Sequence, residues 1–410
     1  MPHSTRTLSI GDCRSIAMQA FQYRGENYGI EQEWVLHEGR DDRARVTEQQ
    51  LAPFVHVELD HTSAVSIEPG GQIELSTAPQ RTLHAATKVL EHDEEVLHAA
   101  LIEAGFEPWW ASIDDSRRPD IVLSNGRYHA MGDFWDKTGG AGRWMMCNTA
   151  STQFNIPNDP VDPVRRWQLM NLVGPVLVAL FGNSPGVDCT GTRWWSLRQG
   201  IWASMDRRRT SQVPLTNEPA EDWLGYALGA DVFYIRSGAA GRAVRAGMSF
   251  YDWMCIGHET GWPTTEDFRY HLTTLFPPVR PKGWLELRML DAMLPQQRRV
   301  AASLLEVLIR SSTTDRLLPV LRETPLEWRA AAELGLRSQH IRDAAKIIAD
   351  MVRAEVRACG LDGFDADALN GYLDAALGHD PESNEGMYNL PVRLDEPLLQ
   401  ASMNALLLGR

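Results

Sequence analysis

Residues 65–76 of this chain read VSIEPGGQIELS, and the pattern predicts a β-hairpin with one apolar and one acidic face. Side chains two positions apart on a strand point to the same side of a sheet. The aliphatic side chains therefore face one way, while Glu68 and Glu74 face the other with their polar neighbours. The Pro-Gly-Gly sequence between the two runs predicts a tight turn, because glycine adopts the positive φ that such turns need. Taken alone, this pattern is typical of a surface hairpin with a solvated polar face.

Two other stretches repeat the acidic spacing. Residues 30–34 (IEQEW) carry Glu31 and Glu33 on one strand face, and residues 284–289 (WLELRM) carry a glutamate beside an arginine. If the three stretches join one sheet, its polar face holds five carboxylates and one guanidinium, a net charge of −4. Two carboxylates about 4 Å apart repel by roughly 4 kcal/mol at an effective dielectric constant of about 20. These carboxylates therefore need bound cations or water to offset their repulsion. Taken alone, the glutamate and arginine at 286 and 288 also fit an internal ion pair.

Divalent cations are the natural partners of such a face. Carboxylate oxygens are hard ligands that suit Mg²⁺ or Mn²⁺ rather than zinc. Two Mg²⁺ ions would balance the predicted charge, and the usual reason to gather them is a nucleoside triphosphate. No GxxxxGK[ST] phosphate loop occurs in the sequence, so we expect the nucleotide to be held by a different fold.

Composition and charge exclude several classes of partner. The 410 residues are 43% apolar and 23% charged, which is enough for a large core. The net charge of −14 repels nucleic acid and anionic membranes, so we expect neither as a partner. The first twenty residues lack an apolar signal core, and the most apolar run, residues 169–181, is too short to span a bilayer. We therefore expect a cytoplasmic protein.

The five cysteines predict no disulfide framework and no thiolate zinc site. Their number is odd, their spacings are wide and no CxxC occurs. Buried free thiols are the favoured interpretation for Cys13, Cys147, Cys189, Cys255 and Cys359.

The organisation of the chain predicts one catalytic domain over residues 1–410, with a sheet-based core at 20–300 and a helical portion at 301–410. Alternating patterns predict strands at residues 29–36, 54–59, 64–67, 72–77, 107–113, 145–156, 232–235 and 284–290. Helical spacing and capping residues predict helices at 83–104, 163–181, 264–275, 298–310, 325–333, 342–359 and 366–377. The long intervals between strands argue for an α+β fold with an antiparallel or mixed sheet.

The acidic stretches resemble the plant and actinobacterial type of glutamate–cysteine ligase. The likeness is carried by GIEQE at 29–33, EPGGQIELS at 68–76, HLTTLFP at 271–277 and LELR at 285–288, and it covers residues 25–300. FPPVRP at 276–281, leading into LELR, is most similar to the branch that serves ergothioneine biosynthesis.

This resemblance implies both a fold and a reaction. The fold is related to the catalytic domain of glutamine synthetase, a bowl-shaped antiparallel sheet with helices packed outside. ATP phosphorylates the side-chain carboxylate of L-glutamate, and the amine of L-cysteine displaces phosphate to give γ-glutamylcysteine. The cofactors implied are ATP and Mg²⁺, with Mn²⁺ as a substitute. Together with the charge count, the resemblance assigns as metal ligands Glu31, Glu33, Glu68, Glu74 and Glu286.

The resemblance also suggests catalytic and substrate-binding residues. Arg288 is expected to act beside Glu286 and to hold a carboxylate of the glutamate substrate. Arg209, in DRRRT at 206–210, falls where the family places an arginine for a substrate carboxylate. Gln153 shares a strand face with Asn155 and is expected to line the substrate pocket.

One residue departs from the plant-type pattern. Asn148 stands where plant-type members have an arginine just before the strand. A carboxylate contact is therefore lost or supplied elsewhere, by Arg143 or Arg127. This departure affects the predicted amino-acid specificity more than the ATP chemistry.

Three other functions stay open at this point. The first, which Asn148 motivates, is a carboxylate–amine ligase of the same fold with a different amine acceptor. The second is a non-catalytic acidic binding protein, which would bind metal without forming ADP. The third is a metal-dependent hydrolase, which would need no ATP and for which the sequence lacks histidine-rich spacing.

Overall fold

A seven-stranded antiparallel sheet forms the centre of the protein. The computed structural model describes residues 8–38, 45–138, 140–237, 240–323 and 327–378. The strand order is β10-β11-β5-β1-β3-β2, and β4 pairs with the far end of β1. The strands are β1 (Gly29–Glu38), β2 (Ala64–Ile67), β3 (Ile73–Ser76), β4 (Phe106–Trp109), β5 (Thr152–Pro157), β10 (Val279–Pro281) and β11 (Trp284–Leu287). Two small hairpins lie apart from this sheet, β6 (Gly186–Val187) with β7 (Arg193–Trp194), and β8 (Tyr234–Ser237) with β9 (Ala240–Ala243).

The two faces of the sheet differ as the alternating sequence predicts. On one face Ile30 and Trp34 of β1 are fully buried in the main hydrophobic core, together with aliphatic and aromatic side chains of β3, β5 and β11. The other face is acidic, because Glu33 lies opposite Glu74 across the β1–β3 ladder. This register places the carboxylates of distant sequence stretches side by side.

Helices cover the outside of the sheet and account for most of the remaining chain. They are α1 (Ile10–Gln19), α2 (Glu48–Leu51), α3 (Leu83–Glu103), α4 (Gly126–Thr138), α5 (Ala141–Asn148), α6 (Pro163–Phe181), α7 (Leu197–Ala203), α8 (Arg207–Thr210), α9 (Pro219–Gly229), α10 (Phe250–Ile256), α11 (Thr265–Leu272), α12 (Pro295–Leu308), α13 (Ser311–Glu323), α14 (Trp328–Leu334), α15 (Gln339–Cys359) and α16 (Ala366–Gly378). Two short 3₁₀ helices span Ala52–His56 and Gly335–Arg337. None of the helices in the described ranges has both the length and the apolar content needed to cross a membrane.

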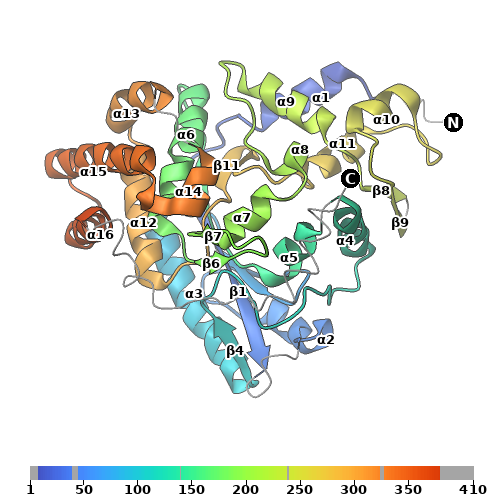
Figure 1. Cartoon of the computed structure of the whole chain (residues 1–410), viewed down its shortest axis with the longest axis horizontal. Coiled ribbons are helices and arrows are strands. Elements are labelled where there is room, and N and C mark those ends of the chain that lie inside the picture. Colours follow the sequence, from blue (N-terminus) through green and yellow to red (C-terminus); the bar gives the residue numbers. More distant parts are fainter. Residues whose placement is uncertain (1–7, 39–44, 139, 238–239, 324–326, 379–410) are drawn as a thin grey trace.

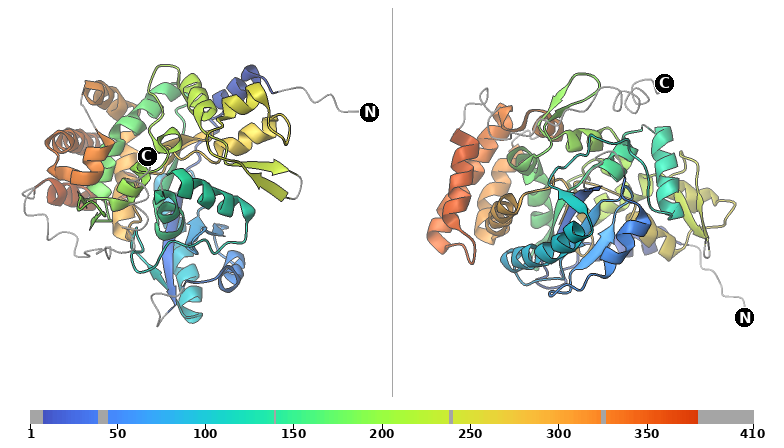
Figure 2. Two further views of the ribbon diagram at one scale, coloured as in Figure 1. Left: turned by 45° about the vertical axis from the view of Figure 1, so that its right-hand side comes forward. Right: turned by 90° about the horizontal axis from the view of Figure 1, so that it is seen from below.

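The arrangement of these helices is plain in Figures 1 and 2. The helices that follow β11, α12 to α16, gather with α6 on one side of the molecule. Helices α1, α9, α10 and α11 lie together on the other side, and α3 runs beside β4 at a third edge. The predicted α+β class with a helical C-terminal part is therefore confirmed.

The strongest helix predictions are confirmed to within about a turn. α3 ends at Glu103, and Gly105, two residues further on, has a φ of 88°, the left-handed conformation that favours glycine. α6 begins at Pro163, and the Asp162 side chain accepts a hydrogen bond from the backbone N–H of Arg165, as an N-cap does.

Two strand predictions are wrong in whole or in part. Residues 54–59 contain no strand: 54–56 end the 3₁₀ helix that begins at Ala52, where Pro53 favours the first helical turn, and 57–59 have no regular structure. Residues 145–148 belong to α5, and β5 begins only at Thr152. The run 145–156 is largely apolar, and an apolar run of this kind does not separate a buried helix from a buried strand.

Candidate active site

The acidic face of the sheet forms one wall of a cavity of about 340 Å³. This volume falls in the range of about 300–1,000 Å³ that is typical of small-molecule sites. The structure brings seven of the predicted site residues to this cavity: Glu31, Glu33, Glu68, Glu74, Gln153, Glu286 and Arg288. The three acidic stretches therefore meet, and the roles of their side chains stay predictions.

The charge of the cavity is not the net −4 that the three stretches predicted. Five cations line it beside the five carboxylates, so the formal charges cancel. These cations are Arg127, Arg198, Arg280, Lys282 and Arg288. The sequence-based count missed four of them, because it considered only the strands that carry the glutamates.

Glu286 lies at the cationic side of the cavity with three basic partners. Its carboxylate accepts hydrogen bonds from Arg280 at 2.6 and 3.1 Å, from the Lys282 Nζ at 2.9 Å and from the Arg288 Nη1 at 2.9 Å. Burial by itself would raise the pKa of Glu286, but Arg280, Arg288 and Lys282 hold it well below its usual range. Both of its oxygens are occupied, so this position favours an ion-pair cluster over the predicted metal ligation.

Glu31 and Glu33 lie on the same wall with neutral partners. The Asn155 side chain donates a 2.8 Å hydrogen bond to Glu31, and the backbone N–H of Ser151 donates one of 2.8 Å to Glu33. Burial, then the nearby carboxylates of Glu286 and Glu74, raise the pKa of Glu31 to about 7. Burial also raises the pKa of Glu33.

Glu74 and Glu68 complete the acidic side of the cavity. The hydroxyls of Ser66 and Ser76 donate hydrogen bonds of 2.8 and 3.2 Å to Glu74. The pKa of Glu74 is raised by burial and by Glu33, and that of Glu68 is raised well above its usual range by burial and by Glu74. Burial is the largest cause of the raised pKa on all four carboxylates.

The four carboxylates have the donor chemistry of a divalent cation site. Glu31, Glu33, Glu68 and Glu74 offer oxygen ligands to the cavity, and within the described ranges the ion pairs of its cations go to other carboxylates and not to these four. As they stand, the described residues form no group of three acidic, histidine or cysteine side chains that could hold a metal ion. The donor set therefore fits Mg²⁺ or Mn²⁺ in type, while the side chains would have to converge to bind it.

Arg127 differs from the other cations of the cavity in its partners. Its Nη2 donates to the backbone oxygen of Thr273 at 3.3 Å, and its guanidinium lies 5.2 Å from the centre of the Tyr270 ring. Its Nε is buried without a hydrogen-bond partner, and across the described ranges it forms no ion pair with a carboxylate. Arg127 thus keeps an uncompensated positive charge at the cavity.

Three predicted substrate residues lie outside the cavity lining. Arg209 is fully buried, donates to the backbone oxygen of Thr274 at 2.9 Å and to that of Asp231, and packs against aromatic rings of α4. Its two terminal nitrogens are therefore engaged inside the protein, and its Nε lies 3.4 Å from the carboxylate of Asp206. The expectation that Arg209 meets a substrate carboxylate is not supported by this position.

Asn148 and Arg143 are also placed away from the cavity. The Asn148 amide donates to the backbone oxygens of Asp114 and Arg117 at 2.8 and 2.7 Å, and its oxygen accepts a hydrogen bond from Arg45. Arg143 pairs with Asp136 at 2.7 Å on the outside of α4. Neither side chain can reach a ligand in the cavity without giving up these partners, so their predicted substrate contacts are not supported.

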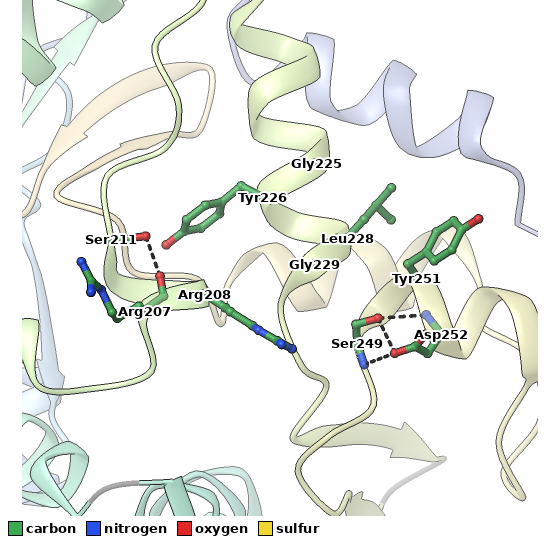
Figure 3. Close-up of a pocket in the computed structure, with 10 residues that line it drawn as sticks. All are labelled: Arg207, Arg208, Ser211, Gly225, Tyr226, Leu228, Gly229, Ser249, Tyr251 and Asp252. Carbon is green, nitrogen blue, oxygen red and sulfur yellow. Dashed lines mark hydrogen bonds between the residues drawn. The ribbon is translucent and has the colours of Figure 1, made fainter. Parts of the chain in front are cut away.

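A second, larger hollow of about 750 Å³ opens between α8, α9 and α10. Figure 3 shows Arg207 and Arg208 of the basic cluster pointing in opposite directions from α8, so they do not converge on one ligand. Arg208 already pairs with Asp231 at 3.2 Å. Despite its size, this hollow lacks a converging set of polar groups, and we place the candidate active site in the smaller cavity.

Comparisons with known proteins show the family of this chain. The family model described as glutamate-cysteine ligase family 2 matches residues 27–368. Glutamate–cysteine ligase EgtA of Mycobacterium tuberculosis is 34% identical over 293 residues, covering 69% of this chain and 68% of that protein. The chloroplastic glutamate–cysteine ligase of Medicago truncatula is 32% identical over 289 residues, covering 65% of this chain and 54% of that protein.

A solved structure shares the fold at much lower sequence identity. The crystal structure of glutamate–cysteine ligase from Francisella tularensis in complex with AMP superposes with a TM-score of 0.52 at 13% identity. The match covers 95% of this chain and 90% of that one.

Proposed function

Because this chain belongs to the glutamate–cysteine ligase family 2, we propose that it joins the γ-carboxylate of L-glutamate to the amine of L-cysteine at the expense of ATP. The products are γ-glutamylcysteine, ADP and phosphate. The observation that carries this proposal is the cavity in which four carboxylates without an ion-pair partner in the described structure face a cluster of cations.

The two sides of the cavity suit different parts of the substrates. We assign the acidic side, Glu31, Glu33, Glu68 and Glu74, to divalent cations. A bound Mg²⁺ would neutralise the phosphates of ATP and stabilise the charge that builds up during phosphoryl transfer. The bound ion would also reduce the repulsion among these four carboxylates, so both the protein and the nucleotide would be stabilised by it.

The cationic side suits the carboxylates of glutamate and the transferred phosphoryl group. Arg288 keeps its guanidinium at the cavity and is oriented by the Gln153 side chain, whose oxygen accepts a 2.7 Å hydrogen bond from it. Arg127, which has no carboxylate partner in the described part of the chain, offers charge-assisted hydrogen bonds to an anion. We assign both arginines to anionic groups of the substrates and Glu286 to the orientation of Arg288.

The chemistry needs positioning more than a covalent protein group. A carboxylate is a poor acyl donor, and transfer of the γ-phosphoryl group of ATP to its oxygen makes phosphate the leaving group. The cysteine nitrogen then forms the amide bond to the carboxyl carbon of that group (Cδ of glutamate) and loses a proton, and the bond from that carbon to the phosphate oxygen breaks. Holding three reactants in one cavity supplies much of the rate enhancement of such a reaction.

The whole described chain supports one catalytic unit, as the sequence predicts. Arg298 of α12 donates to the Gln32 side chain at 3.2 Å and pairs with Glu94 of α3, directly behind the strand that carries Glu31 and Glu33. Helix α12 thus packs against the sheet that carries the cavity. These contacts support our proposal of a single catalytic domain, with the helical portion from residue 301 as part of it.

A different amine acceptor is the rival that the sequence left open. Asn148 motivated it, and Asn148 lies outside the cavity lining with its amide fully engaged. The departure from the plant-type pattern therefore gives no reason to change the acceptor. The acceptor is identified by measuring ADP release from ATP with L-glutamate, Mg²⁺ and each member of a panel of amino acids and amines. Strong turnover with another amine and none with L-cysteine would reject the proposed acceptor.

A further inference from the structure

Arg288 lies just beyond the last residue of β11, where the chain leaves the sheet. The ladder between β11 and β5 ends with Leu287 opposite Phe154. The backbone carbonyls of residues 288–290 therefore need partners outside the ladder, because buried carbonyls without partners are costly.

Helix α7 supplies those partners from two adjacent side chains. Arg198 donates to the backbone oxygens of Arg288 at 3.2 Å and Leu290 at 3.1 Å, and Gln199 donates to that of Met289 at 2.9 Å. Three consecutive carbonyls are thus held by one helix. Gln199 is buried and does not line the cavity.

The same helix contacts the side chain of Arg288. The guanidinium of Arg288 lies 5.9 Å from the centre of the Trp202 ring and 5.8 Å from that of Phe276. The indole N–H of Trp202 donates a 3.1 Å hydrogen bond to the backbone oxygen of Phe276. One helix therefore restrains both the backbone and the side chain of Arg288.

Asp291 connects the N-terminal end of α7 to residues 288–291 by hydrogen bonds. Its carboxylate accepts hydrogen bonds from the hydroxyls of Ser184 at 2.7 Å and Ser196 at 3.0 Å, and it lies 3.7 Å from Arg198. The Ser196 hydroxyl in turn accepts from the backbone N–H of Gln199 at 3.2 Å. The helix start and residues 288–291 form one hydrogen-bonded unit.

We propose that α7 is the positioning element of the substrate-binding arginine, and that Gln199 is a positioning residue for the anionic group that Arg288 binds. This inference rests on the proposed function of Arg288. Misplacing a binding group by a fraction of an ångström weakens the contact it makes, while groups elsewhere in the cavity keep their geometry. Loss of the Gln199 bond should therefore weaken glutamate binding selectively.

The test compares Gln199→Met with a matched control, Gln168→Met. Both glutamines are buried and donate to a backbone carbonyl. Gln168, on α6, donates to that of Thr216 at 3.1 Å and also accepts a hydrogen bond from Arg322. Methionine keeps the length of the side chain and removes its donor. The measurements are the KM for L-glutamate, the KM for ATP, kcat, and the affinity for L-glutamate by calorimetry.

For Gln199→Met we expect the KM and Kd for L-glutamate to rise roughly three- to tenfold, the loss expected for one hydrogen bond. The KM for ATP and kcat should stay within about twofold of wild type, and Gln168→Met should change none of these values. An unchanged glutamate affinity in Gln199→Met, or equal losses in both variants, would overturn the inference. If Gln199→Met fails to fold, Trp202→Phe leaves an aromatic ring, smaller than the indole, and removes the hydrogen bond to the backbone oxygen of Phe276, and the same selective loss is expected from it.

The proposed function can fail independently of this inference. Wild-type protein that binds L-glutamate without forming ADP would reject the reaction, and the affinity ratio between the variants would still test the role of Gln199. Wild-type protein that does not bind L-glutamate would overturn both.

Discussion

Replacing Glu31 with glutamine should stabilise the protein at neutral and alkaline pH when no divalent cation is present. The side chain keeps its shape and its acceptor for the Asn155 amide, which donates a 2.8 Å hydrogen bond to it. The substitution removes one negative charge that lies near the carboxylates of Glu74 and Glu286 in the wall of the cavity.

The magnitude follows from the pKa of Glu31. Folding raises it from 4.5 to about 7, so the folded state binds the proton more tightly than the unfolded state. Wild-type stability is therefore lost as pH rises from 4.5 through 7, and the full cost, on the order of 3 kcal/mol, applies above pH 7. Glu31→Gln does not titrate, so its advantage over wild type should be small near pH 4.5 and largest near pH 8.

The assay is urea unfolding at pH 5 and pH 8 in the presence of EDTA, followed by titration with Mg²⁺. Glu38→Gln is the matched control, since Glu38 lies at the exposed end of the same strand. Mg²⁺ at a hundred times its Kd should stabilise wild type by about 2.7 kcal/mol and Glu31→Gln by less. Glu31→Gln should also lose ATP-dependent activity.

Two results would refute this reasoning. One is a Glu31→Gln protein that is no more stable than wild type at pH 8 without metal. The other is an advantage of the same size at pH 5 and pH 8, which would show that the titration of Glu31 is not its source.

Three other variants test the assignments in the cavity. Arg127→Gln should raise the KM for ATP or L-glutamate at least tenfold with little change in melting temperature, because its charge is uncompensated in the described structure; unchanged kinetics would remove Arg127 from the site. Glu286→Gln should abolish ADP formation and destabilise the fold by about 3–5 kcal/mol, because it leaves buried cations without their carboxylate; a variant that melts like wild type would contradict the ion-pair cluster. Arg209→Met should change the melting temperature while the KM for L-glutamate stays within about twofold, and a selective rise in that KM would restore Arg209 as a substrate ligand.

The acidic wall was predictable because strand geometry decides it locally. Glu31 and Glu33 are two positions apart on β1, and Glu74 faces Glu33 once the hairpin pairs with that strand. Alternation fixes the face of every residue on a strand, so the converging carboxylates follow from spacing and one pairing.

The missing cations were not predictable in the same way. Arg280 lies on β10 and Lys282 in the turn after it, and only the register of the pairing between β10 and β11 sets Arg280 opposite Glu286. This hairpin could have been found from the Lys-Gly turn at residues 282–283, since Gly283 has a φ of 87°. Arg127 and Arg198 lie on α4 and α7, and the face that a helix turns to a cavity depends on tertiary packing.

Arg209 and Asn148 show the limit of assigning roles by resemblance. Both stand at the positions that the family pattern indicates, yet their polar groups are satisfied by backbone carbonyls inside the protein. A sequence pattern shows which residue occupies a position, whereas burial and partners decide whether a ligand can reach it.

The most direct test of the account is ADP release by the purified chain with ATP, Mg²⁺, L-glutamate and L-cysteine, with the product identified by mass. We predict ADP formation that depends on both amino acids, equimolar with a product of the mass of γ-glutamylcysteine. ADP formation with no amide product, or none with any amine in the panel, would contradict it.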